Sequence, residues 1–366
     1  MRIDYRISLP LLFSLLIAGC DDPSLSEEKA KVGPAEQDPL ACLPVAGITP
    51  ICGFKNPEDL VQLPGTRHLL VSEMGEFMMD TPGKLLIYDI DAARQQDLPI
   101  NWSSQAEVWG DEDCMAPEPG LFSPHGIDLS HRGDNRTQLL VVNHGGREAV
   151  EFFEVLAAPG GWTLQWRGCA LPPGDPFIND VVALSDGGFL VTHMWNKSIA
   201  FEEVGRRLLN GEKMGWVWEW QAESGFSFVA NSQQVMPNGI TVSADNEKIF
   251  INVYMGNKII KLDRASGMLE SAFDVRQPDN VTIDDDGMLW IASHQHDPLN
   301  ESCTAEQGPC LLPFQVVRVD SETMLGETVI DHQGAPMGYV TVALKVGDEI
   351  FMGSAHGDRL ARTKLN

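Results

Sequence analysis

One kind of segment recurs six times along this chain: an apolar strand that opens on polar residues and is followed by two more apolar strands. The six openings are "EDLVQL" (58–63), "HGIDLS" (125–130), "NDVVAL" (179–184), "NGITVS" (238–243), "DNVTID" (279–284) and "GYVTVA" (338–343). Repeated strand units without a helical period between them are typical of a β-propeller, in which each repeat forms one blade. We therefore predict an all-β protein, a six-bladed β-propeller with four-stranded blades around a central channel.

The strands that complete each repeat are also apolar runs. The second strands are "HLLVSEMG", "QLLVVNHG", "GFLVTHMW", "KIFINVYM", "MLWIASHQ" and "EIFMGSAHG". The third strands are "KLLIYDI", "AVEFFEV", "SIAFEEV" (198–204), "KIIKLDR", "FQVVRVD" and "RLARTKL". Because a propeller closes as a unit, we expect a single domain over residues 41–366.

The polar openings predict a cation site. Innermost strands line the channel of a propeller, so equivalent positions on them meet near one axis. At one channel mouth we expect Glu58, His125, Asn179, Asn238, Asp279 and Asn280. Carboxylate and amide oxygens without sulfur are the ligands that Ca²⁺ takes. Turn chemistry is the alternative, because Asn-Gly and Asp-Gly are common loop dipeptides, but it does not explain why these residues precede the first strand of a repeat.

The N-terminus has the character of an export signal, in which Arg2 and Arg6 precede the apolar run "LPLLFSLLIAGC". This run is too short to span a bilayer, and its end resembles a bacterial lipobox with Cys20 as the lipidated residue. We expect a lipoprotein signal peptide over 1–19, followed by the lipidated Cys20 and a flexible tether over 20–40. The protein would then be held to a membrane of the bacterial cell envelope and face the periplasm, with Asp21 favouring the inner membrane.

Charge and cysteines narrow the class further. The formal net charge of −26 argues against nucleic acid as a partner, because phosphate binding requires Lys and Arg. Six cysteines follow the lipobox, and disulfides are plausible in an exported chain. Local pairing would join Cys42 to Cys52 and Cys303 to Cys310, which would leave Cys114 to pair with Cys169, although six cysteines allow 15 connectivities. Zinc is less favoured, because no CxxC spacing is present.

The polar openings also carry a family resemblance. In order and blade position, the chain resembles the paraoxonase/arylesterase family through "PEDL", "SPHGI", "LLVVNH", "NDVVA", "NGITVS" and "DNVTID…LWIASH". The similarity runs from about residue 53 to the C-terminus. It implies two Ca²⁺ ions, one catalytic and one structural, and hydrolysis of lactones, with aryl esters and some organophosphates as further substrates.

The resemblance assigns roles to individual residues. The catalytic calcium would be held by Glu58, Asn179, Asn238, Asp279 and Asn280. The structural calcium would be held by Asp59, Asp180 and the backbone carbonyl of Ile127. Neighbours on a strand project in opposite directions, so Glu58 and Asn179 could face the upper ion while Asp59 and Asp180 face the lower ion. Asp279 and Asn280 differ, because both would serve the upper ion.

His125 and His144 match the family's histidine pair above the catalytic ion. An exposed Ca²⁺ would polarise the carbonyl or phosphoryl oxygen of the substrate. His125, with His144 behind it, would activate water, since an unperturbed histidine pKa of about 6.5 suits a base at neutral pH.

The chain also departs from the family pattern. Animal paraoxonases join their chain ends by a disulfide, whereas no cysteine follows Cys310 here, so closure must rest on strand pairing or other contacts. The loop "EMGEFMMDTPG" (73–83) differs from the animal pattern and is expected in the pocket wall. Candidate wall residues are Met78, Met79, Met194, Trp195, Phe226, Phe228 and His294.

Two rival classes stay open. One is another propeller enzyme, gluconolactonase-like or strictosidine-synthase-like. The other is a non-enzymatic ligand-binding propeller, because one fold hosts many functions. The full succession of Glu-Asp, His-Gly, Asn-Asp, Asn-Gly and Asp-Asn favours the paraoxonase group, with a small-molecule lactone or ester as substrate.

Overall fold

The computed structural model describes residues 41–76, 81–103, 107–298, 300–303 and 308–365. The chain divides into two units, Met1–Asp38 and Pro39–Asn366, and the fold described below is that of the second unit. The predicted signal peptide, the lipidation site at Cys20 and the tether lie outside the described residues.

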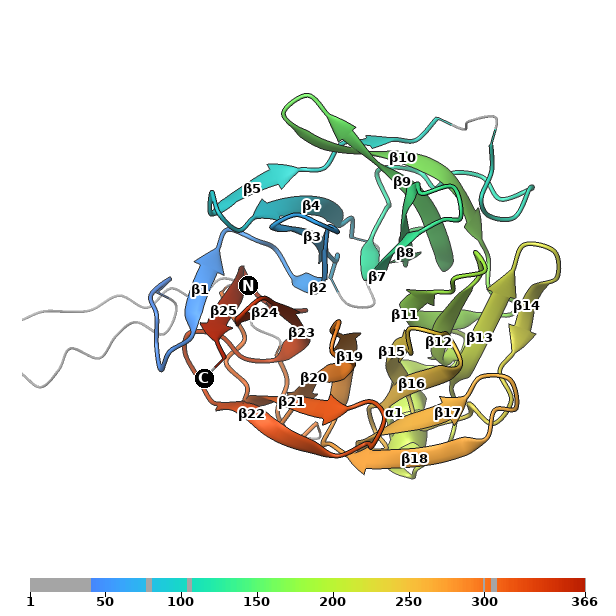
Figure 1. Cartoon of the computed structure of the whole chain (residues 1–366). Coiled ribbons are helices and arrows are strands. Elements are labelled where there is room, and N and C mark those ends of the chain that lie inside the picture. The colour runs from blue at the N-terminus through green and yellow to red at the C-terminus, as the bar shows by residue number, and fades with distance from the viewer. Residues whose placement is uncertain (1–40, 77–80, 104–106, 299, 304–307, 366) are drawn as a thin grey trace, which may run out of the picture. The chain divides into compact units, whose positions relative to one another are not determined.

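Six sheets follow one another around a central axis, which confirms the predicted six-bladed all-β propeller (Figure 1). The inner strands are β2 (Pro57–Gln62), β7 (Pro124–His131), β11 (Pro176–Ala183), β15 (Pro237–Val242), β19 (Pro278–Ile283) and β23 (Val340–Val346). The second strands are β3 (His68–Glu73), β8 (Thr137–Asn143), β12 (Phe189–Asn196), β16 (Lys248–Val253), β20 (Met288–His294) and β24 (Glu349–Ser354).

The third and outer strands complete each blade by antiparallel pairing. The third strands are β4 (Lys84–Asp89), β9 (Ala149–Ala158), β13 (Trp216–Gln221), β17 (Lys258–Asp263), β21 (Phe314–Asp320) and β25 (Arg359–Lys364). The outer strands are β5 (Arg94–Asp97), β10 (Gly161–Ala170), β14 (Gly225–Phe228), β18 (Leu269–Asp274), β22 (Gly326–His332) and β1 (Thr49–Cys52). The second blade alone among the described sheets has a fifth strand, β6 (Ile100–Asn101), which runs parallel to β10.

Closure of the ring rests on strand pairing, as expected from the lack of a cysteine near the C-terminus. The strand β1 pairs antiparallel with β25, with Thr49 opposite Arg362, so the first described strand completes the last blade. The three expected disulfides are confirmed as Cys42–Cys52, Cys114–Cys169 and Cys303–Cys310.

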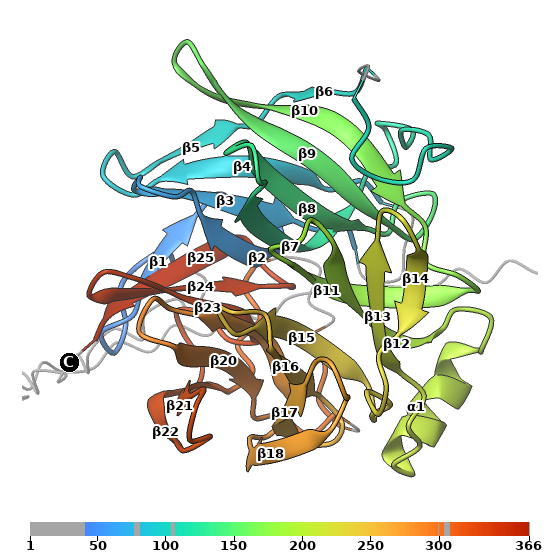
Figure 2. The ribbon, with the colours of Figure 1, turned by 45° about the vertical axis from the view of Figure 1, so that its right-hand side comes forward.

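One predicted strand is wrong. The segment "SIAFEEV" is not the third strand of the third blade, because helix α1 (Phe201–Leu209) takes up most of it and β13 supplies the strand instead. Val204 and Leu208 are one helical turn apart and buried, while acidic residues occupy the first turn and basic residues the last, which suits the helix dipole. Figure 2 shows α1 at one end of the third blade.

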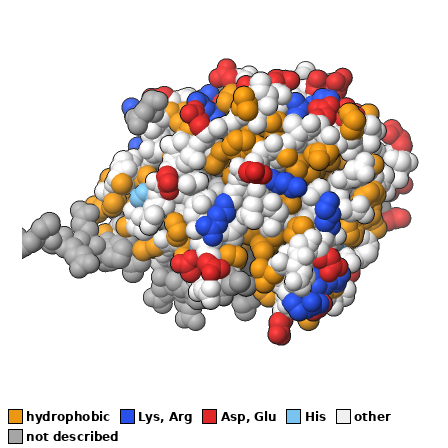
Figure 3. Space-filling view, turned by 90° about the horizontal axis from the view of Figure 1, so that it is seen from below, with side chains coloured by type: hydrophobic (Ala, Val, Ile, Leu, Met, Phe, Trp, Pro, Cys, Tyr) orange, Lys and Arg blue, Asp and Glu red, His pale blue; other side chains and the backbone are white. Residues whose placement is uncertain are grey.

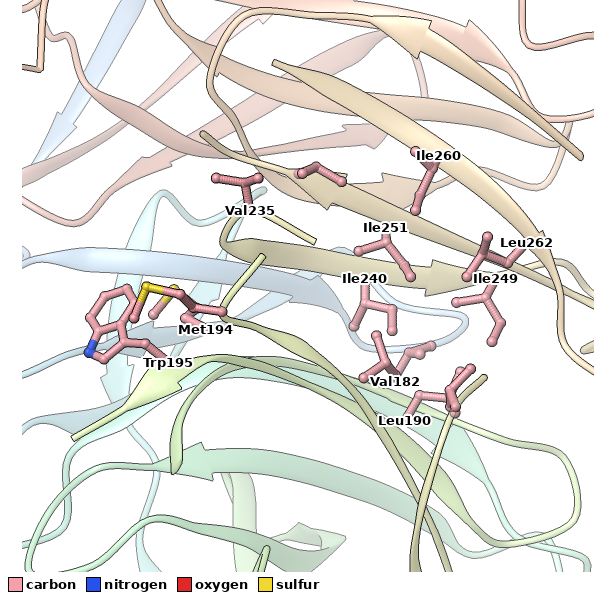
Figure 4. Packing of buried hydrophobic residues seen from close by; sticks show 14 of the residues in the cluster. Val182, Leu190, Met194, Trp195, Val235, Ile240, Ile249, Ile251, Ile260 and Leu262 are labelled. Carbon is pink, nitrogen blue, oxygen red and sulfur yellow. The ribbon is translucent and has the colours of Figure 1, made fainter. Parts of the chain in front are cut away.

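Apolar side chains hold the blades together in six clusters, one between each pair of neighbouring blades. Figure 4 shows the cluster between the third and fourth blades, where Val182 and Leu190 face Ile240, Ile249 and Ile251. Each fully buried aliphatic side chain contributes about 1.5–3 kcal/mol. The core therefore lies between blades.

The outer surface carries mixed charge. On the face shown in Figure 3, Lys and Arg side chains are scattered among Asp and Glu. No helix in the described ranges is both long enough and apolar enough to cross a bilayer.

Candidate active site and metal centre

All six inner strands break their regular pairing at the polar openings. The register of β2 against β3 shifts between Pro57 and Asp59, and that of β19 against β20 between Pro278 and Val281. A β-bulge bends a strand and re-aims its side chains. The expected alternation of neighbouring polar side chains between the two faces of a strand is therefore interrupted at these openings.

The turn into the inner strand is fixed in four blades by a residue with positive φ. These residues are Asn56 (46°), Met236 (63°), Gln277 (38°) and Tyr339 (51°). A non-glycine residue in this region costs about 1–3 kcal/mol and is found preferentially at functional sites. Proline follows in three of the four, at the first residue of a strand, a position where its missing N–H is tolerated. The quoted motifs included Pro57 but not Pro237 or Pro278, so the recurrence of proline at this position is a sequence signal for the site that was not used.

The glycines of the His-Gly and Asn-Gly openings lie in strands, so turn chemistry does not explain them. A Cβ added to Gly126 would lie 2.6 Å from the Asn179 carbonyl oxygen, and one on Gly239 would lie 2.5 Å from the Asp279 carbonyl oxygen. Neither distance is sterically possible without a shift of the neighbouring strand. These glycines allow adjacent inner strands to approach closely at the channel mouth.

The structure brings the predicted upper residues together. Asn280 Nδ2 donates to Glu58 Oε1 at 2.8 Å, and His125 Nε2 lies 3.8 Å from the same oxygen. The Asn238 amide hydrogen-bonds to the Asp279 carboxylate. All of these side chains are buried, and Glu58 is 1% exposed.

The oxygens of this upper cluster fit a hard cation. Four buried oxygens of this cluster have no hydrogen-bond partner within the described residues: Glu58 Oε2, Asn179 Oδ1, Asn238 Oδ1 and Asn280 Oδ1. A buried oxygen left in this state costs about 1–3 kcal/mol, so four at one place point to a ligand. Across the same residues, no group of three or more His, Cys, Asp and Glu is placed to hold a metal ion. The four unpartnered oxygens belong to one carboxylate and three amides, a donor set without sulfur that fits a hard cation.

Electrostatics support the same interpretation. Burial raises the pKa of Glu58 to about 7, against the hydrogen bond from Asn280 and the charge of His144. Burial, followed by the charge of Glu58, raises the pKa of Asp279. A divalent cation would relieve this repulsion and favour both carboxylates in their ionised form.

The lower pair of aspartates is bonded differently. Asp59 accepts from the backbone N–H of Leu60 and, in the next blade, of Ile127, each at 2.8 Å. Asp180 accepts from Val181 and, in the next blade, from Ile240, again at 2.8 Å. These carboxylates therefore join the first blade to the second and the third to the fourth.

Asp59 and Asp180 also line the same cavity of about 160 Å³ in the channel. Burial, then the charge of Glu58, raises the pKa of Asp59. Burial, then the charge of Asp59, raises the pKa of Asp180. Two buried carboxylates that repel each other in this way suit a cation between them.

The two predicted histidines are neighbours, with ring centres 4.9 Å apart and planes at 55°. His125 Nδ1 lies 2.9 Å from the Asn179 carbonyl oxygen, which can only accept, so Nδ1 carries the hydrogen and Nε2 is left unprotonated. Burial, and then the charge of His144, lowers the pKa of His125 to about 3. The expectation of an unperturbed value for His125 was therefore wrong, because the side chain is buried.

Two charged groups near His144 were not predicted from the motifs. His144 Nδ1 lies 2.9 Å from Glu148 Oε2, and Lys197 Nζ lies 2.9 Å from Glu148 Oε1. Glu148 precedes β9 and Lys197 follows β12, 49 residues further along the chain. Only the four-residue separation of His144 and Glu148 was visible in the sequence.

The predicted wall residues are only partly correct. Met194 and Trp195 are buried in the core cluster that includes residues of the third and fourth blades, and Phe226 and Phe228 lie on β14, the outermost strand of its blade. These four do not face the upper cluster as predicted, because Met194 and Trp195 lie on β12 and pack into the core cluster, and β14 lies at the rim. His294 does reach the cluster, with Nε2 3.4 Å from Asp279 Oδ2. Met78 and Met79 lie outside the described residues.

Solved structures with the same fold include two enzymes. A luciferin-regenerating enzyme is 13% identical, with a TM-score of 0.52, and the match covers 86% of this chain and 92% of that one. A gluconolactonase from Xanthomonas campestris is 15% identical, with a TM-score of 0.52, and the match covers 87% and 89%. At these identities the likeness shows the fold alone. No curated protein matches the chain.

The class of fold is that of a six-bladed β-propeller, and the sequence identifies the family. A family model described as Arylesterase matches residues 55–360. The chain belongs to the arylesterase family. This match covers all six inner strands, and with them every predicted ligand position.

Proposed function

We propose that this protein hydrolyses lactones and aryl esters with a calcium ion bound at the upper channel mouth. The observation that supports the proposal is the convergence of four buried, unpartnered oxygens on Glu58, Asn179, Asn238 and Asn280. Asp279 completes the donor set, and Asn238 hydrogen-bonds to its carboxylate. Ca²⁺ bound there would polarise the substrate carbonyl and offset the negative charge that develops on its oxygen.

The histidine pair would supply the base. His125 is fixed by its bond to the Asn179 carbonyl and presents an unprotonated Nε2 on the side of Glu58. A water held beside that nitrogen would lose a proton to the pair as its oxygen attacks the carbonyl carbon. His144 is held against the face of Phe177, with ring centres 4.7 Å apart, which limits rotation of its ring.

We also propose that Asp59, Asp180 and the carbonyl of Ile127 hold a second, structural calcium. Their carboxylates already join neighbouring blades through backbone N–H groups. A cation between them would remove the repulsion that raises the pKa of Asp59 and Asp180 beyond the effect of burial. This ion would have a role in stability rather than in the chemical step.

The test uses the purified full chain. Its calcium content is measured, and hydrolysis of an aliphatic lactone and of a phenyl ester is followed in calcium and in chelator. We expect bound calcium and turnover that chelator abolishes and added calcium restores. Well-folded, calcium-loaded protein that turns over neither substrate would contradict the enzyme proposal and favour a ligand-binding propeller.

We further propose that Cys20 carries lipid and anchors the propeller, as a domain over residues 41–366, to a bacterial membrane from the periplasmic side. The support is the lipobox-like "LIAGC" and the polar segment over 21–40. Mass spectrometry of the mature N-terminus should find acylated Cys20. A Cys20→Ser variant that still fractionates with membranes would refute the anchor.

A further inference from the structure

His144 is held on two sides. Its Nδ1 lies 2.9 Å from Glu148 Oε2 and 3.1 Å from Oε1, and Phe177 stacks on the ring with 2° between the planes. Because an ionised carboxylate can only accept, Nδ1 carries the hydrogen. In the neutral ring the nitrogen without a hydrogen is then Nε2, which is buried and has no hydrogen-bond partner among the residues that the structure describes.

Glu148 is itself fixed in place. Its side chain is 6% exposed, and it accepts from the Ile178 backbone N–H at 3.1 Å and from Lys197 Nζ at 2.9 Å. Burial alone would raise the pKa of Glu148. The charges of His144 and Lys197 and their hydrogen bonds outweigh burial, so the pKa of Glu148 is lowered. The carboxylate is therefore ionised at neutral pH.

We propose that Glu148 is a positioning residue for hydrolysis, which holds His144 in the tautomer with a free Nε2 and balances the charge that the histidine pair gains. This inference rests on the proposed function. During hydrolysis an O–H bond of water breaks, the oxygen bonds to the carbonyl carbon, and the proton passes to the pair. When the bond to the leaving group breaks, that proton goes to the leaving alkoxide.

The surroundings of His144 single out Glu148 for this role. The charged and titratable groups around the pair and Glu148 are Glu58 from the first blade, Glu148 from the second, and His193 and Lys197 from the third. Of these, Glu148 is the one hydrogen-bonded to a ring nitrogen of His144. Lys197 contacts the carboxylate and not the imidazole, so its charge moderates that of Glu148.

The kinetic test compares Glu148→Gln with Lys197→Met in the full chain. For a phenyl ester, Glu148→Gln should lower kcat by about 10-fold to 100-fold with little change in KM. The acid limb of its kcat profile should move to lower pH, because a protonated His144 loses a negative neighbour. Lys197→Met should move that limb to higher pH. Glu154→Gln is the matched control, since Glu154 is also buried but pairs with Arg167, and it should leave both quantities unchanged.

A spectroscopic test is independent of turnover. Nitrogen-15 NMR of the imidazoles, with the His144 signals assigned by their loss in His144→Gln, should show a protonated Nδ1 in the parent. In Glu148→Gln we expect a mixture of tautomers. The inference would be overturned if Glu148→Gln kept the His144 tautomer, the kcat and the acid limb of the parent. If the calcium-loaded parent hydrolyses no ester or lactone, the proposed function fails, and the NMR result still decides whether Glu148 positions His144.

Discussion

The upper cluster and the lower pair of aspartates lie on the same inner strands of the channel. Their polar atoms differ in whether they have hydrogen-bond partners. At the upper level, buried oxygens of Glu58, Asn179 and Asn238 have no hydrogen-bond partner within the described chain. At the lower level, both carboxylates accept backbone N–H groups from two strands each. Unpartnered oxygens lower stability, whereas joints between blades raise it. The upper level is thus suited to binding a ligand, and the lower level to holding the ring together.

The largest effect should come from removing an upper donor. Asp279→Ala should reduce ester hydrolysis by more than about 10³-fold, because the change removes a ligand and not only one hydrogen bond. The fold should survive, since the repulsion between buried carboxylates is reduced at the same time. Initial rates and thermal melts check both points, with Asp285→Ala, which alters an exposed turn residue, as the control. If Asp279→Ala hydrolysed esters at the parental rate, the upper level would not be the site of a ligand needed for hydrolysis.

Calcium should stabilise the parent strongly. A ligand that binds only the folded state at 1,000 times its Kd adds about 4 kcal/mol to the free energy of unfolding. Urea unfolding in calcium and in chelator measures this difference. Coincident curves would exclude a calcium ion at either level.

Substitutions in the lower pair of aspartates should lower the free energy of unfolding more than they lower activity. Asp180→Ala leaves the N–H groups of Val181 and Ile240 without their acceptor, at a cost of about 2–4 kcal/mol in unfolding free energy. Asp180→Asn keeps an acceptor oxygen and should lose less. An unchanged urea midpoint in Asp180→Ala would contradict a joint between the third and fourth blades.

A further effect should be a pH dependence in the stability of the metal-free protein. Glu58 has its pKa raised from 4.5 to about 7 by burial, so the folded protein holds a proton that the unfolded chain has lost between these values. Stability should therefore fall as pH rises from about 4.5 to about 7. Calcium should remove most of this slope by favouring the ionised carboxylate. Equal slopes in calcium and in chelator would place the cation away from Glu58.

Much of this architecture was visible in the sequence, because the inner strands repeat with their polar residues at one position. Because Glu58, Asn179, Asn238 and Asp279 occupy equivalent positions in the repeats, the sequence alone predicted that they lie at one level of the channel. It did not predict how their side chains contact one another. The bulges were not predicted, because they depend on the register against a second strand. Helix α1 was missed because "SIAFEEV" has the apolar content of a strand. The helical i, i+4 spacing of buried residues consists only of Val204 and Leu208, and Leu208 lies beyond the quoted segment.

The surroundings of the site were harder to predict than the site itself. Glu148 and Lys197 meet at His144 only because the second and third blades are neighbours, a relation that local spacing does not encode. Phe226 and Phe228 were misplaced because an aromatic run does not reveal whether its strand is the third or the outermost of a blade. The packing of one blade against the next therefore limits what repeats and motifs can predict.

The central claim is that the upper level binds the catalytic cation. Calorimetric titration of chelator-treated protein with calcium tests it most directly, with the parent compared with Asn238→Ala and Asp180→Ala. We expect two calcium-binding sites in the parent and one in each variant. Asn238→Ala should lose ester hydrolysis together with the upper site. Two intact sites in Asn238→Ala, together with parental hydrolysis, would contradict the claim.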